Sequence, residues 1–336
     1  MEQVVVDYER CRRLGQFLDS LNFRLPEEEL EPEDIPAPDA RMFYFALVAI
    51  CHQTSPIGKP RLEGTVDGKF YYGYEYLYER WMVAAKADLC ILGREWLRTA
   101  QAGDVITILH DRERGSTISD PDGRAELLRD IGRKMLLDGV RHVDEYYEKS
   151  GGWLRDHDGR PGLETLFSRF EAYGKDPVKK KLTFFFILMK RYGYWEYRDS
   201  ENLGAPVDYH EMRLHLRLGT ANVLDQQLLA KINSGQVLTS AEDVTIRQAI
   251  YDAIFEISRS SGRIPADLHN LFWHMSRNCC RRDETHCTSC SKHGSLPVRY
   301  VALLTEQKCI FADNCRSASL PHAEKIKEPL VDTELY

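Results

Sequence analysis

The sequence predicts a mostly α-helical protein with one small β-hairpin and a cysteine-rich C-terminal region. Apolar residues recur at helical spacing in two long segments, residues 127–135 and 246–257. Asp67 and Gly68 separate two short runs rich in β-forming residues, which predicts the hairpin. Six of the nine cysteines gather between residues 279 and 315. We therefore expect a helical body followed by a short region with a chemistry of its own.

The first part of the chain changes sharply in composition. Residues 7–21 carry the pattern of a short amphipathic helix, and a Pro- and Glu-rich stretch follows to about residue 40. Residues 41–51 are nearly all apolar and predict a buried helix. Three residues of types that cap helices well mark further expected helix starts: Asp208, Ser240 and Asp267.

Composition also divides the chain into three segments. Residues 1–40 hold the first helix and the acidic linker, residues 41–278 a helical domain, and residues 279–336 a Cys-rich loop and tail. With 336 residues, 43% of them apolar, the chain can bury a sizeable core. Its longest apolar run, residues 184–189, is far too short to cross a bilayer, and its first residues do not resemble a signal peptide. We expect a soluble, cytoplasmic protein with no membrane partner.

The net charge of −7 is concentrated in one place. Seven acidic residues and no basic one lie between residues 27 and 39, and the rest of the chain carries 45 basic and 45 acidic residues. A neutral body can still present a basic face. Charge therefore neither supports nor excludes a nucleic-acid partner.

The C-terminal cysteines predict a metal site. Cys280, Cys287 and Cys290 are separated by six and two residues, and Cys309 and Cys315 follow. Disulfides are rare in cytosolic proteins, and thiolates at such short spacing can converge on one ion or cluster. A structural zinc site is the alternative to an iron–sulfur cluster, and a group of free thiols is the third interpretation.

Two further segments carry residues suited to cleaving a bond at an anomeric carbon. Three lysines, residues 179–181, stand where a Gly/Pro turn enters an apolar helix. Such a segment is most often a solvated helix start, but a partly buried lysine there has a lowered pKa and can act as an amine nucleophile. Asp208 opens the next helix, either as its N-cap or as a carboxylate that stabilises positive charge on a sugar. Trp273 is either a core residue or a platform for a base, and His269 either a surface residue or a base reader.

Together these segments resemble the helix-hairpin-helix base-excision glycosylase superfamily, a two-lobed helical fold. Lys181, the Pro-Val-Asp-Tyr sequence at residues 206–209 and the helix from Pro265 to Trp273 are similar to the archaeal 8-oxoguanine DNA glycosylases. The match covers about residues 174–278. It implies that Lys181 is a Schiff-base nucleophile and Asp208 the catalytic carboxylate.

A longer stretch resembles the queuosine-salvage family, which hydrolyses a 7-deazaguanine base from its nucleotide. The matching parts are residues 67–74, 124–136, 208–209, 235–247 and 271–273. This resemblance also implies a catalytic role for Asp208. Pro206 stands where the queuosine-salvage family has an aromatic residue, and His269 stands where both families have another residue. The identity of the released base therefore stays open.

The cysteine spacing is similar to the iron–sulfur loop of endonuclease III and the adenine glycosylases. That resemblance implies a 4Fe–4S cluster held by Cys280, Cys287 and Cys290, with Cys309 or Cys315 as the fourth ligand. The His-Gln-Thr at residues 52–54 resembles the Gln-Thr that these enzymes place near the displaced base, which implies that Gln53 contacts substrate.

Three functions are consistent with these observations. The first is a DNA glycosylase for a modified purine, with or without lyase activity, in which the displaced base is flipped into a pocket. Its catalytic residues would be Asp208 and Lys181, and its substrate contacts are expected at Gln53, Tyr209, His269 and Trp273. The second is a hydrolase for a free modified nucleotide, and the third a non-catalytic, metal-stapled module that binds nucleic acid.

Overall fold

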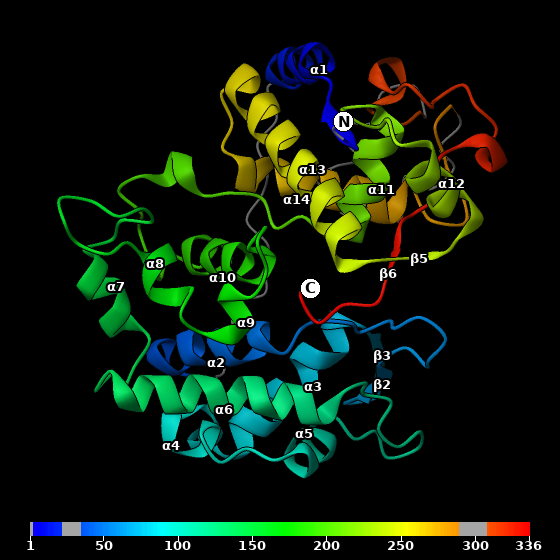
Figure 1. Ribbon diagram of the computed structural model, residues 1–336. Helices are drawn as coiled ribbons and strands as arrows, with labels where there is room; N and C mark the ends of the chain where they lie inside the picture. The colour runs from blue at the N-terminus through cyan, green and yellow to red at the C-terminus, as the bar shows by residue number, and fades with distance from the viewer. Residues whose placement is uncertain (1–2, 22–34, 289–307) are drawn as a thin grey trace. The chain divides into compact units, whose positions relative to one another are not determined.

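The computed structural model describes residues 3–21, 35–288 and 308–336, and this part of the chain is mostly helical (Figure 1). Contacts divide the chain into two compact units. Unit 1 comprises Met1–Glu27 and Leu203–Val331, and unit 2 comprises Glu28–Asn202 and Asp332–Tyr336. None of the described helices is long and apolar enough to span a membrane.

Unit 2 is a set of helices with one antiparallel hairpin. Its described elements are α2 (Ala37–Ala49), β2 (Glu63–Val66), β3 (Lys69–Tyr72), α3 (Tyr74–Ala87), η1 (Leu89–Leu92), α4 (Arg94–Leu97), α5 (Ala102–Ile108), α6 (Pro121–Leu137), α7 (Asp144–Ser150), α8 (Leu163–Phe167), α9 (Glu171–Gly174), α10 (Lys180–Arg191) and η2 (Ser200–Asn202).

Helix α2 forms the centre of unit 2. It contacts α3, α6 and α10, and Figure 1 shows it between α6 and α10. Because it is covered on all sides, almost every residue from Ala40 to Ala49 is buried. The ring of Phe45 stacks on that of Tyr173 with centroids 5.2 Å apart, and the Tyr173 hydroxyl donates to the Phe45 carbonyl at 2.5 Å. This packing fixes the C-terminal end of α2, from which the loop of residues 50–53 continues.

Unit 1 is built around a long helix, α13. Helices α1, α11 and α14 pack against α13 (Figure 1). Strands β1 and β4 pair beside α13. A second, parallel pair joins β5 to β6. The described elements are β1 (Val4–Val6), α1 (Tyr8–Ser20), α11 (Tyr209–Leu218), β4 (Ala221–Val223), α12 (Gln226–Ser234), β5 (Val237–Leu238), α13 (Ser240–Ser261), α14 (Pro265–Asn278), η4 (Ala312–Asn314), η5 (His322–Glu324) and β6 (Leu330–Val331).

The mostly helical fold class with one small hairpin is confirmed, and so are several of its elements. Asp7 caps α1, which spans Tyr8–Ser20 as the amphipathic pattern predicts. In the hairpin β2 pairs with β3, and Asp67 and Gly68 both have the positive φ that a tight two-residue turn requires. The pairs β1–β4 and β5–β6 were not predicted, since their strands are two or three residues long.

Some predicted helix boundaries are wrong. Helix α2 begins at Ala37, before the predicted residue 41, because Pro36 and Pro38 fit the first turn of a helix. Thr239 caps α13 in a capping box with Glu242, so Ser240 is the first helical residue rather than the cap. Helix α14 begins at Pro265 after Ile264, which places Asp267 within the first turn.

Candidate functional site

The start of α10 turns one lysine into the core of unit 2. The buried carboxylate of Asp176 accepts from the backbone amides of Val178 at 3.1 Å and Lys180 at 2.9 Å. Lys179 adopts a left-handed conformation with φ of 57° and pairs outward with Glu164 at 2.5 Å. The next turn therefore directs Lys181 inward, where only 1% of its surface is exposed. A solvated helix start, the common interpretation of such a lysine run, is wrong for Lys181.

The Lys181 amine is surrounded by three hydrogen-bond acceptors. Its Nζ lies 2.9 Å from the Ala49 carbonyl, 2.9 Å from the Glu334 carbonyl and 3.1 Å from His52 Nδ1. An ammonium group has three hydrogens to donate, and these three acceptors take all of them. Acceptance by Nδ1 places the remaining proton of a neutral His52 on Nε2, which is buried and has no partner among the described residues.

Burial makes this pair chemically unusual. Removal from water, reinforced by the nearby Arg124 guanidinium, lowers the pKa of Lys181 from its ordinary 10.5 to about 7. Burial and the Lys181 charge lower the pKa of His52 well below 6.5, so the imidazole is neutral at physiological pH. A neutral base thus contacts an amine that loses its proton near neutrality, as an amine nucleophile requires.

Arg124 holds the loop that carries His52 and Gln53. Its fully buried guanidinium donates to the carbonyls of Ile50, His52 at 2.5 Å and Ser119 at 2.8 Å. Charged donors on carbonyls make strong hydrogen bonds, and here they order a loop that lacks regular structure. Gln53 has a positive φ of 44°, and its side chain lies beside the C-terminal segment.

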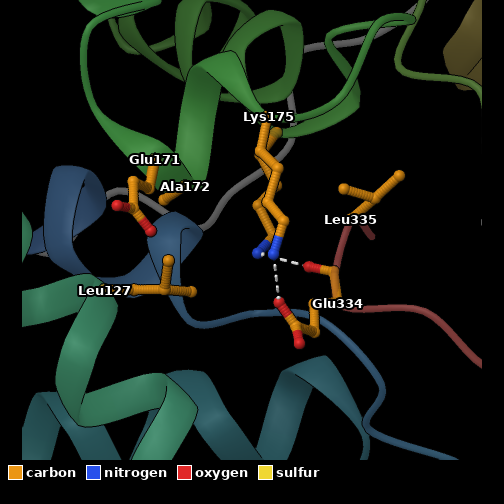
Figure 2. Close-up of a pocket in the computed structure, with 7 residues that line it drawn as sticks. Leu127, Glu171, Ala172, Lys175, Glu334 and Leu335 are labelled. Carbon is orange, nitrogen blue, oxygen red and sulfur yellow. Dashed lines mark hydrogen bonds and ion pairs between the residues drawn. The ribbon is translucent and has the colours of Figure 1, made fainter.

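Residues 332–336 lie on this same loop and on Lys181. Gln53 donates through Nε2 to Asp332 Oδ1 at 2.6 Å and through its backbone amide to the Tyr336 carbonyl at 3.3 Å. Lys175 donates to the Glu334 carboxylate at 2.8 Å. Figure 2 shows the Lys175 and Glu334 side chains joined by this hydrogen bond. A cavity of about 10 Å³ remains beside Lys181, Lys175 and Glu334, close to the smallest space that holds one water molecule.

The second group of predicted residues lies in unit 1, along α11 and α14. Asp208 is the N-cap of α11: its Oδ1 accepts from the His210 amide at 2.8 Å, and 8% of the residue is exposed. Tyr209 follows as the first helical residue, and the rings of His210 and Trp273 meet edge to face at 5.9 Å. Trp273 is only partly buried, and the Arg277 guanidinium covers its ring at 4.8 Å.

Buried ionisable groups continue this contact between α11 and α14. His269 Nδ1 lies 2.6 Å from the carboxylate of Glu211, and both side chains are buried. The interpretation of His269 as a surface residue is therefore wrong. Arg213 pairs with Glu328 and donates to Ser276 Oγ at 2.7 Å. The α11–α14 contact is therefore polar at its centre, although both helices have an apolar pattern.

The described cysteines of the C-terminal region approach one another in unit 1. The Cys309 amide donates to the Cys287 carbonyl at 3.0 Å. Arg217, itself buried, donates through Nη1 to Cys280 Sγ at 3.4 Å, and its carbonyl accepts from Cys315 Sγ at 3.4 Å. Burial and the neighbouring thiols raise the pKa of Cys309 well above 9.

These thiols are suitable in type for a soft metal or an iron–sulfur cluster, and the Arg217 charge beside Cys280 suits an anionic thiolate. However, no three Cys, His, Asp or Glu side chains in residues 3–21, 35–288 and 308–336 are arranged so that they could hold a metal ion. The predicted ligand Cys290 lies outside the described residues. The described residues alone therefore do not form a metal centre.

The predicted site residues thus fall into two sets. Gln53 and Lys181 belong to unit 2 and share contacts with residues 332–336, whereas Asp208, Tyr209, His269, Trp273 and the cysteines belong to unit 1. Sequence reasoning did not select His52, Arg124 or Glu334. Only His52 carried a signal, as a neighbour of Gln53 after a buried helix.

The comparisons with known proteins add no family. No protein-family model matches the chain, and no curated protein is significantly similar to it in sequence.

Proposed function

We propose that the chain is an N-glycosidase that cleaves the base–sugar bond of a modified purine, with damaged or modified DNA as its first candidate substrate. One observation carries the proposal: a lysine amine, buried and with its pKa lowered to about 7, contacts the neutral imidazole of His52. An amine that attacks a sugar carbon needs this combination of a lowered pKa and a neighbouring base.

The chemistry follows from that pair. The lone pair of Lys181 Nζ attacks C1′, and the C1′–N bond breaks so that its electrons leave with the base. His52 Nδ1, at 3.1 Å, accepts the proton that Nζ gives up. The Nζ lone pair then forms a C=N bond to C1′ as the C1′–O4′ bond breaks, and O4′ takes the proton held by His52, which leaves a Schiff base between Nζ and C1′. Positive charge develops on the sugar during base departure, and Asp208 is the carboxylate that we propose stabilises it.

A second candidate is a hydrolase for a free nucleotide with a modified base, a 7-deazaguanine among the possibilities. The specific observation in its favour is that the Lys181 amine already has three acceptors, as expected of a structural ammonium group. In that case water would be the nucleophile, and Asp208 would orient it or stabilise the sugar cation.

Base release measured by mass spectrometry tests both candidates. The substrates are duplexes with oxidised or alkylated purines and, separately, queuosine monophosphate. We expect release from a modified duplex, loss of release in Asp208→Asn, and a borohydride-trapped adduct that is absent in Lys181→Ala but present in the matched control Lys180→Ala.

Other outcomes decide against this assignment. Release from the nucleotide alone, without an adduct, would establish the second candidate. Turnover that Asp208→Asn leaves unchanged would remove Asp208 from the catalytic residues. No turnover on either set would favour the non-catalytic nucleic-acid-binding module.

A further inference from the structure

Residues 332–336 accept four hydrogen bonds from the rest of unit 2. The carboxylates of Asp332 and Glu334 and the carbonyls of Glu334 and Tyr336 each accept a hydrogen bond. Their donors are the Gln53 side chain, the Lys175 and Lys181 amines, and the Gln53 backbone amide. Four donors, two of them lysine amines, therefore converge beneath this segment.

These four donors are suited to the oxygen atoms of an anion. Phosphate and sugar hydroxyl oxygens accept from ammonium and amide groups as the carboxylates and carbonyls of residues 332–336 do here. The backbone amides of Val178 and Lys180, which could otherwise meet a phosphate at the start of α10, already donate to Asp176. Lys175, which is 58% exposed and bound to Glu334, is the cation within this donor set that a ligand can reach from solvent.

The same segment blocks the Lys181 amine. Nζ has the Ala49 carbonyl, His52 and the Glu334 carbonyl around it, and 1% of the residue is exposed. Ala49 and His52 belong to α2 and its following loop, whereas Glu334 belongs to a short segment without helix or strand. Displacement of the Glu334 carbonyl is therefore the simplest change that would let a carbon atom approach Nζ.

We propose that residues 332–336 are an internal occupant of a site for a phosphorylated sugar, in which Lys175 binds the phosphate and Lys181 faces the sugar carbon. The proposal rests on the proposed function and specifies its ligand and its resting state. The Glu334 carboxylate stands where the phosphate binds, and the Glu334 carbonyl stands where the sugar meets Nζ. Substrate binding then requires that the segment be displaced.

Reductive labelling tests this without any nucleobase. The probe is ribose 5-phosphate, with ribose as the phosphate-free control. Nζ attacks C1 of the open-chain sugar, the carbonyl oxygen leaves as water, and hydride from cyanoborohydride reduces the resulting C=N bond to a stable amine. Tandem mass spectrometry localises the label, and the exposed Lys149 on α7 serves as an internal reference.

Deletion of residues 332–336 is expected to raise labelling of Lys181 relative to Lys149 several-fold. In the deleted chain ribose 5-phosphate should label Lys181 several-fold more than ribose does, and Lys175→Ala should abolish that preference. A full-length Asp332→Ala/Glu334→Ala variant, which loses both side-chain anchors, should show a smaller rise. It keeps the test valid if the deletion disturbs folding, which circular dichroism will reveal.

Unchanged labelling of Lys181 in both variants would show that residues 332–336 do not occupy the site. Equal labelling by ribose and by ribose 5-phosphate would show that the site does not bind phosphate. A duplex with an abasic site, trapped in the same way, separates the two sources of sugar phosphate. A stronger signal from the duplex assigns the ligand to a nucleic-acid backbone, and a stronger signal from ribose 5-phosphate assigns it to a free nucleotide. Because no base is released in this assay, labelling can succeed even if the N-glycosidase activity is absent.

Discussion

Three consecutive lysines at the start of α10 have three different environments. Lys179 forms an ion pair with Glu164, the Lys180 amine lies 5.1 Å from the ring centre of Phe184, and Lys181 is buried against His52. The sequence indicated that a buried lysine in this run can act as a nucleophile. It could not reveal the burial itself, because the Ala49 carbonyl and the Glu334 carbonyl come from positions 132 and 153 residues away. Local pattern thus located the residue, and tertiary contacts determine its chemistry.

The lowered pKa of Lys181 predicts how stability depends on pH. An unfolded chain binds this proton up to a pH of about 10.4, whereas the folded chain releases it at about 7. Between these values the unfolded state binds more protons, so this residue makes the protein more stable as pH rises through that window. The effect is at most about 1.4 kcal/mol per pH unit.

Replacement of Lys181 by Met should remove that contribution. We expect the difference in melting temperature between Lys181→Met and the wild type to be most favourable to the variant near pH 7 and to become less so toward pH 10. The exposed Lys149→Met is the matched control and should show no such trend. Parallel pH profiles for Lys181→Met and the wild type would mean that Lys181 keeps an ordinary pKa in the folded state.

At the scale of elements, capping shows what sequence can and cannot locate. Asp208 was predicted at a helix start and is the N-cap of α11. Ser240 and Asp267 are equally good capping types, yet the chain uses Thr239 for α13 and begins α14 at Pro265 after Ile264. Thr239 and Glu242 satisfy each other's backbone amides, and Pro265 needs no amide partner, so each start has its own physical cause.

Two substitutions of Asp208 can distinguish its role as a helix cap from a role in catalysis. Asn caps a helix as well as Asp, so Asp208→Asn should unfold within about 0.5 kcal/mol of the wild type, whereas Asp208→Ala should lose about 1 kcal/mol. Both variants lack the carboxylate and should lose glycosidase activity if that group stabilises the sugar cation. Denaturant unfolding and base release, measured on the same samples, check the two expectations. Activity that falls only in Asp208→Ala would show that Asp208 acts as a cap alone.

At the scale of the whole molecule, the unpredicted features are contacts between distant parts of the chain. Val4–Val6 pairs with Ala221–Val223, and Val237–Leu238 pairs with Leu330–Val331. Each unit also combines two separate stretches of the chain. Hydrophobic periodicity reports which face of an element is buried but carries no information on its partner, which is why the helices were predictable and these pairings were not.

The cysteine region provides the last prediction, because a metal there would hold the cysteines of residues 280–315 together. We expect the chain, purified without oxygen, to be brown and to contain iron and acid-labile sulfide, with a colourless zinc protein as the alternative. Cys280→Ser should lower the metal content and the melting temperature, since Cys280 contacts the buried Arg217 and lies beside the other thiols. The matched control is Cys90→Ser, an exposed cysteine in η1 of unit 2, which should leave both quantities unchanged. Elemental analysis, visible absorption and thermal unfolding measure these outcomes. A metal-free wild type that melts like Cys280→Ser would establish that the cysteines are free thiols and bind no metal.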